Sequence, residues 1–153
     1  MSIRAVYDCM IFLQAASNPH RVHSTFRLVE SGAVTLYVSA EVLAEVRDVL
    51  SRPRHKAKFP ALTDDHVSEF LTAMAKLATL VDEVPDIYTV LRDPKDSKYV
   101  NLAVAAGAEY LVSWDRHLLG LMDEHSPEGA NFRVRFPALR ILDPIGFLAF
   151  AAK

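Results

Sequence analysis

The segment that decides the fold is 93-DPKDSKYVNLAVAAGAEYLVSWD-115. Acidic residues precede a helical stretch that ends at Gly107, and the apolar run "EYLVSW" then leads to Asp115. Glycine directly after the last helical residue is a common helix stop, and short, continuously apolar runs are typical of strands buried on both faces. We therefore predict a helix followed by a buried parallel strand, with Asp115 just past the end of that strand.

The same alternation of strands and helices extends over the whole chain. Strands are predicted at 3–7, 34–38, 79–84, 109–114 and 139–142, and helices at 23–31, 40–51, 63–78, 97–106, 116–122 and 144–152. The segment 124–133 is predicted to be a loop. Alternating elements with apolar strands indicate an α/β protein with three layers (α/β/α) and a mainly parallel central sheet. A chain of this length fits one domain, which we expect to span residues 1–153.

Composition and charge exclude several classes of protein. No apolar run approaches the about 20 residues of a membrane span, and the N-terminus lacks the features of a signal peptide, so we expect a cytoplasmic protein without membrane association. The single cysteine, Cys9, excludes an intrachain disulfide and a multi-cysteine zinc site. A net charge of −2 provides no global attraction for nucleic acid. The basic stretch 51-SRPRHKAKFP-60 is either a local nucleic-acid contact or a solvated loop with ordinary surface charge.

Four carboxylates occupy positions where a parallel sheet would bring them together. Asp8 interrupts the apolar stretch 3-IRAVYDCMIFLQA-15, Asp115 follows another strand, Asp96 begins a helix, and Glu45 lies one turn into a third. Ligands of α/β sheets bind at the carboxyl ends of the strands, so we expect these acids to share one site. Each also has an ordinary alternative: Asp96 and Asp115 as helix caps, and Glu45 as a surface acid. The alternative is weakest for Asp8, because no helix start obviously follows it and a lone buried carboxylate is costly.

The chemistry of such a cluster indicates a divalent cation. Carboxylates in one cleft repel one another unless a cation neutralises them or some are protonated. Oxygen ligands without a nearby cysteine or histidine set suit Mg²⁺ or Mn²⁺, and such a site favours phosphate chemistry. A haloacid-dehalogenase-like phosphatase would have a second Asp at position 10, and a receiver domain would have paired acids after the first strand. Both alternatives are therefore disfavoured.

Three stretches of the sequence resemble the PIN-domain family of metal-dependent nucleases, which includes VapC-type toxins of bacterial toxin–antitoxin pairs. They are "AVYDCMIFLQA", "YVSAEVLAEVRDVLSRP" and "DPKDSKYVNLAVAAGAEYLVSWDRHLL", the last of which carries an S/T-x-D motif. The resemblance runs from Ile3 to about Leu119. It implies an acidic quartet that holds Mg²⁺ or Mn²⁺, a hydroxyl partner and an accessory acid. The quartet consists of Asp8, Glu45, Asp96 and Asp115. The hydroxyl partner is Ser113, and the accessory acid is Asp93.

The resemblance implies an endoribonuclease that hydrolyses RNA through metal-activated water, with a cognate antitoxin as partner. Phosphate contacts are predicted for five basic residues: Arg52, Arg54, Lys56, Lys58 and Arg116. Apolar positions in two helical segments also predict self-association, most simply a dimer. The sequence departs from the family at Met10, where Asn is common, so a slow nuclease is expected. The alternative is a PIN-fold RNA or protein interaction module that is weakly active or inactive.

Overall fold

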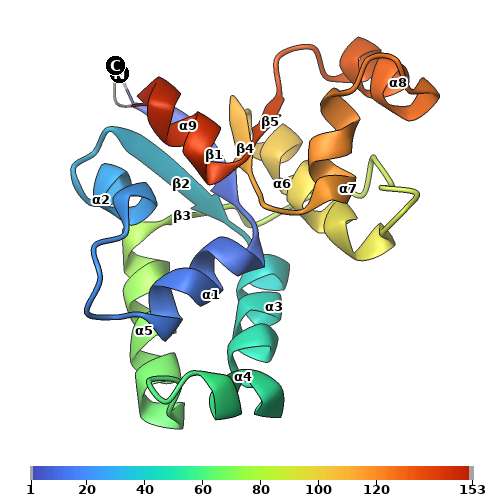
Figure 1. Cartoon of the computed structure of the whole chain (residues 1–153). Helices are drawn as coiled ribbons and strands as arrows, with labels where there is room; N and C mark the ends of the chain where they lie inside the picture. Colours follow the sequence, from blue (N-terminus) through green and yellow to red (C-terminus); the bar gives the residue numbers. More distant parts are fainter. Residues whose placement is uncertain (1, 152–153) are drawn as a thin grey trace.

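The computed structural model describes residues 2–151, and its centre is a five-stranded parallel sheet in the order β3-β2-β1-β4-β5 (Figure 1). The strands are β1 (Ile3–Tyr7), β2 (Val34–Val38), β3 (Thr79–Leu80), β4 (Tyr110–Val112) and β5 (Arg140–Leu142). The chain builds one half of the sheet outward from β1 and then returns to add β4 on its other side. The order therefore reverses between β1 and β4, which is the point where parallel sheets bind ligands.

Helices cover both faces of the sheet. They are α1 (Cys9–Ser17), α2 (Ser24–Glu30), α3 (Ala40–Leu50), α4 (Pro53–Lys58), α5 (Asp64–Leu77), α6 (Ser97–Ala106), α7 (Arg116–Leu119), α8 (Pro127–Arg135) and α9 (Pro144–Ala151), with single 3₁₀ turns at Pro94–Asp96 and Gly120–Met122. The ring of Tyr7 in β1 meets Phe26 of α2 and Phe147 of α9 edge-on, so both helices cover one face. Helix α6 packs on the opposite face (Figure 1). The three-layer α/β/α prediction is confirmed.

The predicted loop at 124–133 is wrong, because the structure forms helix α8 there. The Ser126 hydroxyl accepts a hydrogen bond from the Gly129 backbone N–H at 3.0 Å, and Pro127 occupies the first helical position. Phe132 is fully buried against other aromatic rings. Glycine is required at position 129, because a Cβ there would overlap the carbonyl group of Asp123. A cap and one buried anchor therefore build a helix that hydrophobic periodicity does not reveal.

Two other local expectations need correction. The stretch 51–60 contains helix α4 and is not simply a loop. A helix, α1, also begins directly after Asp8, although the sequence shows no obvious helix start there. Of the described residues, none belongs to a helix with the length and apolar character needed to cross a bilayer.

Candidate functional site

Asp8 directly follows β1, and its side chain caps the N-terminus of α1. Its Oδ1 accepts hydrogen bonds from the backbone N–H groups of Met10 at 3.0 Å and Ile11 at 3.4 Å, and its Oδ2 accepts one from the Ser113 hydroxyl. Only 3% of Asp8 is exposed. Burial raises the pKa of Asp8 to about 6, although these hydrogen bonds act in the opposite direction. Asp8 is thus a buried acid whose position is fixed by three donors.

Ser113 joins the ends of β1 and β4 across the point where the strand order reverses. It is fully buried, and its hydroxyl donates to Asp8 and accepts from the Asp115 backbone N–H at 2.9 Å. Asp115 in turn caps α7, because its Oδ1 accepts from the His117 backbone N–H at 2.7 Å. One hydroxyl therefore sets the relative positions of two acids from different strands.

Asp115 belongs to a cluster of three aspartates that lies close enough to Asp8 to be affected by its charge. Asp93, Asp96 and Asp115 are half-buried, and one carboxylate oxygen from each lies within 4.8 Å of the others. Burial, followed by the negative charges of Asp115 and Asp93, raises the pKa of Asp96 to about 8. The charge of Asp8 acts on Asp96 in the same direction, although more weakly. The structure therefore places four of the predicted acids close enough to repel one another.

Asp96 provides the observation that fits a divalent cation best. Its Oδ2 is buried and has no hydrogen-bond partner among residues 2–151. Asp96 occupies the N-cap position of α6, but its side chain makes no cap hydrogen bond to the helix. Asp93, by contrast, accepts from the Lys95 backbone N–H at 3.3 Å. Capping and metal binding are compatible in such residues, because a carboxylate has two oxygens.

Glu45 belongs to a separate, already neutralised group. Its Oε2 accepts a 2.5 Å hydrogen bond from the Lys98 ammonium, and its Oε1 accepts one from the Tyr99 hydroxyl. Burial would raise the pKa of Glu45, but the hydrogen bonds from Lys98 and Tyr99 outweigh it and lower the pKa. Cys9 lies against this group, and burial raises the pKa of its thiol to about 12. The sequence analysis missed Lys98 and Tyr99, which no motif singles out.

A cleft of about 830 Å³ is lined by the sequence neighbours of two of the aspartates, although none of the three aspartates lines it. Arg92 precedes Asp93, Arg116 follows Asp115, and both arginines line the cleft. Neither forms an ion pair within residues 2–151. The cleft therefore carries positive charge on residues that are adjacent in sequence to Asp93 and Asp115.

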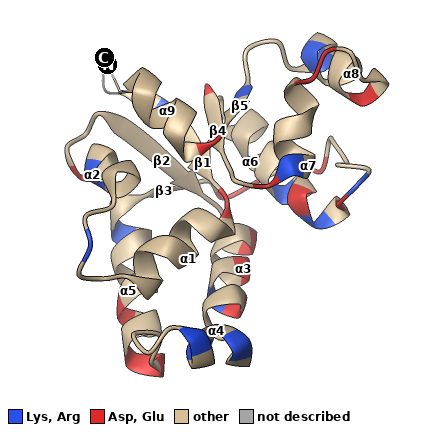
Figure 2. Cartoon of the chain, viewed as in Figure 1, with Lys and Arg blue, Asp and Glu red and all other residues tan. Residues whose placement is uncertain are grey.

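The basic residues of the 51–60 stretch, which were predicted to contact phosphate, lie away from the aspartate cluster (Figure 2). Figure 2 shows the basic residues of α4 at the end of α3 that lies away from the sheet. Arg52 pairs with Asp48 at 3.1 Å, and Lys56 pairs with Asp64. Of the five predicted basic contacts, only Arg116 is next to the aspartate cluster in the chain.

Comparisons with known proteins agree with this fold. The structure resembles a crystal structure of VapBC2 from Rickettsia felis bound to a DNA fragment from their promoter, with 16% identity, coverage of 92% of this chain and 98% of that chain, and a TM-score of 0.50. It also resembles PAE2754 from Pyrobaculum aerophilum, with 18% identity, coverage of 90% and 98%, and a TM-score of 0.51. At these identities the similarity shows the fold alone. No curated protein matches the sequence.

The family comparison extends over most of the chain. The sequence model of the PIN domain matches residues 4–117, which include β4, all of β1 except Ile3, and all six site residues predicted from the sequence. PIN domains are in general nucleases that bind divalent metals. The acidic cluster at the ends of β1 and β4 fits that chemistry, because it offers only oxygen donors and leaves one of them unpaired. The chain belongs to the PIN-domain family.

Proposed function

We propose that this protein is an endoribonuclease that requires Mg²⁺ or Mn²⁺ and hydrolyses RNA phosphodiester bonds. The observation that carries the proposal is the buried, unpartnered Oδ2 of Asp96 within the cluster of three aspartates. A divalent cation would satisfy this oxygen and favour the charged carboxylate against the burial and the repulsion that raise the pKa of Asp96. Magnesium and manganese are the cations that such carboxylate oxygens favour.

The predicted site residues have three kinds of role in this proposal: ion ligand, positioning residue and acceptor for water. Asp93, Asp96 and Asp115 would hold the ion, with Asp8 as a further ligand that Ser113 orients. A bound divalent ion activates water and offsets negative charge on the phosphoryl oxygens. Glu45 is kept ionised by Lys98 and Tyr99, which suits it to accept a hydrogen bond from water at the edge of the site.

We further propose that the protein is the toxin of a bacterial toxin–antitoxin pair and binds a cognate antitoxin protein. The fold similarity to the VapBC2 structure supports this assignment. Self-association as a dimer is part of the same proposal. Two large apolar side chains on α9, Ile145 and Phe150, are 70% and 49% exposed and offer a surface for it.

The test is cleavage of RNA by purified protein with and without Mn²⁺. Wild-type protein is expected to cleave only with the metal, and Asp96→Asn to lose that activity. Asp82→Asn is the matched control, because it changes an exposed aspartate outside the cluster. Equal cleavage by wild type and Asp96→Asn would contradict the proposal.

The alternative is a PIN-fold interaction module that no longer cleaves RNA, and Met10 in place of the common Asn is the feature that favours it. Melting temperatures with and without Mn²⁺ separate the two functions. A ligand that binds only the folded state raises the melting temperature by mass action. A protein that binds RNA, shows no shift in millimolar metal and does not cleave would be such a module.

A further inference from the structure

We propose that Trp114 is a platform beside the site on which one nucleobase of the substrate RNA stacks. The inference rests on the proposed nuclease function and deepens it. Trp114 is the only tryptophan in the sequence. No motif assigns it a role, since it is the variable residue of the S/T-x-D motif.

The position of Trp114 is the first argument. The residue before it, Ser113, is fully buried and bonds Asp8, and the residue after it, Asp115, belongs to the aspartate cluster. Trp114 itself is 41% exposed. The chain therefore places a large apolar ring at the surface directly between two residues of the site.

The second argument is that the indole is already anchored without a ligand. Its Nε1–H donates to the side-chain oxygen of Gln14 at 3.1 Å. Since an indole has no other polar atom, this bond leaves only the aromatic surface available for contact. A fixed ring loses little conformational freedom when a base stacks on it.

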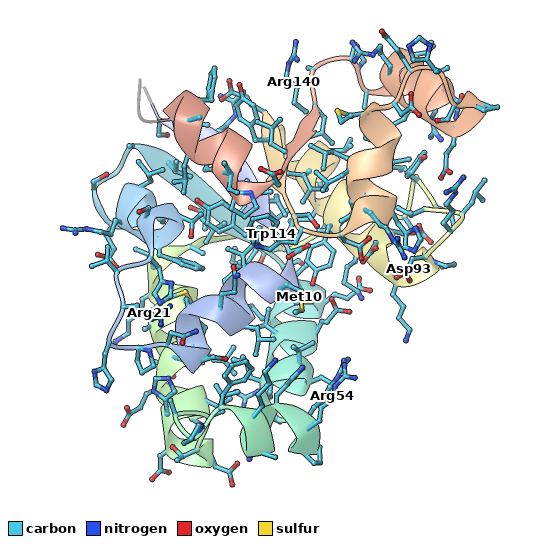
Figure 3. All side chains as sticks on the ribbon, viewed as in Figure 1. Met10, Arg21, Arg54, Asp93, Trp114 and Arg140 are labelled. Carbon is cyan, nitrogen blue, oxygen red and sulfur yellow. The ribbon has the colours of Figure 1, made fainter. Side chains whose placement is uncertain are left out.

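Met10 lies on the side of α1 that holds Trp114. It precedes Gln14, the hydrogen-bond partner of Trp114, by one turn, so the side chains of Met10 and Gln14 lie on the same side of the helix. Met10 is 42% exposed, and its backbone N–H bonds Asp8. Figure 3 shows Met10 and Trp114 in the central part of this view. The helix that carries Met10 therefore connects Asp8 of the site with the residue that holds the indole.

The charges in this part of the chain favour a nucleic acid as the occupant. Arg92 and Arg116 adjoin Asp93 and Asp115 in sequence, line one cleft and form no ion pair within residues 2–151. Guanidinium groups position phosphates, and aromatic rings stack on unpaired bases. Bases inside an A-form duplex are already stacked and do not present their faces to a side chain. Duplex RNA is therefore the control for stacking on Trp114.

Tryptophan fluorescence tests the proposal directly, because Trp114 is the only source of the signal. The experiment uses the full chain with Asp96→Asn, which prevents cleavage, in Mg²⁺. Single-stranded oligouridylate is expected to quench the fluorescence, and a duplex RNA of equal length to leave it nearly unchanged. Fluorescence anisotropy of labelled oligouridylate gives the affinity independently.

Two substitutions in the same background separate stacking from folding. Trp114→Ala is expected to weaken oligouridylate binding about five- to hundredfold, and Trp114→Phe to retain most of the affinity. Circular dichroism melting checks that both variants fold. Mn²⁺ binding, measured by calorimetry in an otherwise wild-type chain carrying Trp114→Ala, is expected to match wild type, because the indole is not a ligand.

Three outcomes would overturn the proposal. If oligouridylate binds without changing the fluorescence, or binds Trp114→Ala as tightly as the parent, the platform is wrong while the nuclease function stands. If a purified protein partner, but not RNA, requires Trp114 for binding, the surface is a protein interface. If wild-type protein neither binds Mn²⁺ nor cleaves RNA, the proposed function fails together with the platform.

Discussion

Two acidic regions at the same edge of the sheet differ in how their charge is balanced. Glu45 has its own cation, the Lys98 ammonium, and the two side chains are only 19% and 13% exposed. Within residues 2–151 the three clustered aspartates form no ion pair, and the pKa of Asp96 rises to about 8 while that of Glu45 falls. The difference favours the aspartates, rather than Glu45, as the acids that a cation from solution would neutralise in the proposed site. Proximity to the strand ends alone does not distinguish them.

Asp8→Asn is expected to have the largest effect on activity. The amide oxygen can still cap α1, so the fold should remain, but the change removes the charge and the acceptor for Ser113. Metal-dependent RNA cleavage is expected to fall more than about 100-fold, as for loss of a direct metal ligand rather than of its supporting shell. A cleavage assay on protein with an unchanged circular dichroism spectrum measures this. Activity equal to wild type would show a contaminant or a different site.

Lys98→Met removes the positive charge that balances Glu45, so that Glu45, like the three clustered aspartates, would have no counter-charge from Lys98. It leaves a partly buried Glu45 without its counter-charge, which is expected to lower the free energy of unfolding by about 1–3 kcal/mol. Chemical denaturation measures this loss, and the double variant Lys98→Met/Glu45→Gln should recover part of it. A single variant as stable as wild type would show that Lys98 does not balance Glu45.

The raised pKa of Asp96 in the aspartate cluster predicts how the stability of the protein depends on pH in the absence of metal. The folded-state pKa of Asp96, about 8, is above the ordinary aspartate pKa of 3.8. The protonated carboxyl therefore favours the folded state, and this contribution is lost as pH rises from about 4 to about 8. In chelator, the melting temperature of wild type should fall relative to that of Asp96→Asn over this range. Parallel curves for the two proteins would contradict the raised pKa.

Met10→Asn is expected to have the smallest effect. An amide at this position can hydrogen-bond to the ligands of the site, whereas a thioether is only a weak acceptor. Cleavage is expected to rise by about tenfold at most, or to need less metal. The half-exposed position makes unfolding of the variant unexpected. A folded variant with wild-type metal affinity and rate would show that position 10 does not tune the site.

Much of the fold could be predicted because its signals are local. Ser39 and Thr63, residue types common at helix starts, cap α3 and α5 with hydrogen bonds from the backbone N–H groups of Val42 and His66. Gly107 ends α6 with a positive φ of 63°, which glycine adopts without strain. Helix α8 was not predicted, because only two of its residues, Gly129 and Phe132, are buried. A pattern of apolar positions cannot reveal a helix that buries so little.

The site could be predicted only in part, because its chemistry depends on contacts between distant segments. The strand ends allowed Asp8 and Asp115 to be placed near one another, since parallel topology brings such ends to one edge. The pairing of Glu45 with Lys98 joins positions 53 residues apart, and no spacing rule predicts it. The cap made by Asp8 was missed because the following residues, "CMIFL", are apolar and lack a usual helix-start pattern.

Calorimetric titration with Mn²⁺ tests the central claim most directly, because it detects the ion without requiring an RNA substrate. Wild-type protein and the Asp82→Asn control are expected to bind Mn²⁺, and Asp96→Asn to bind it at least tenfold more weakly, since it removes one charge and the unpartnered oxygen. Absence of binding by wild type, or equal binding by wild type and Asp96→Asn, would contradict the claim that the aspartate cluster holds a divalent cation.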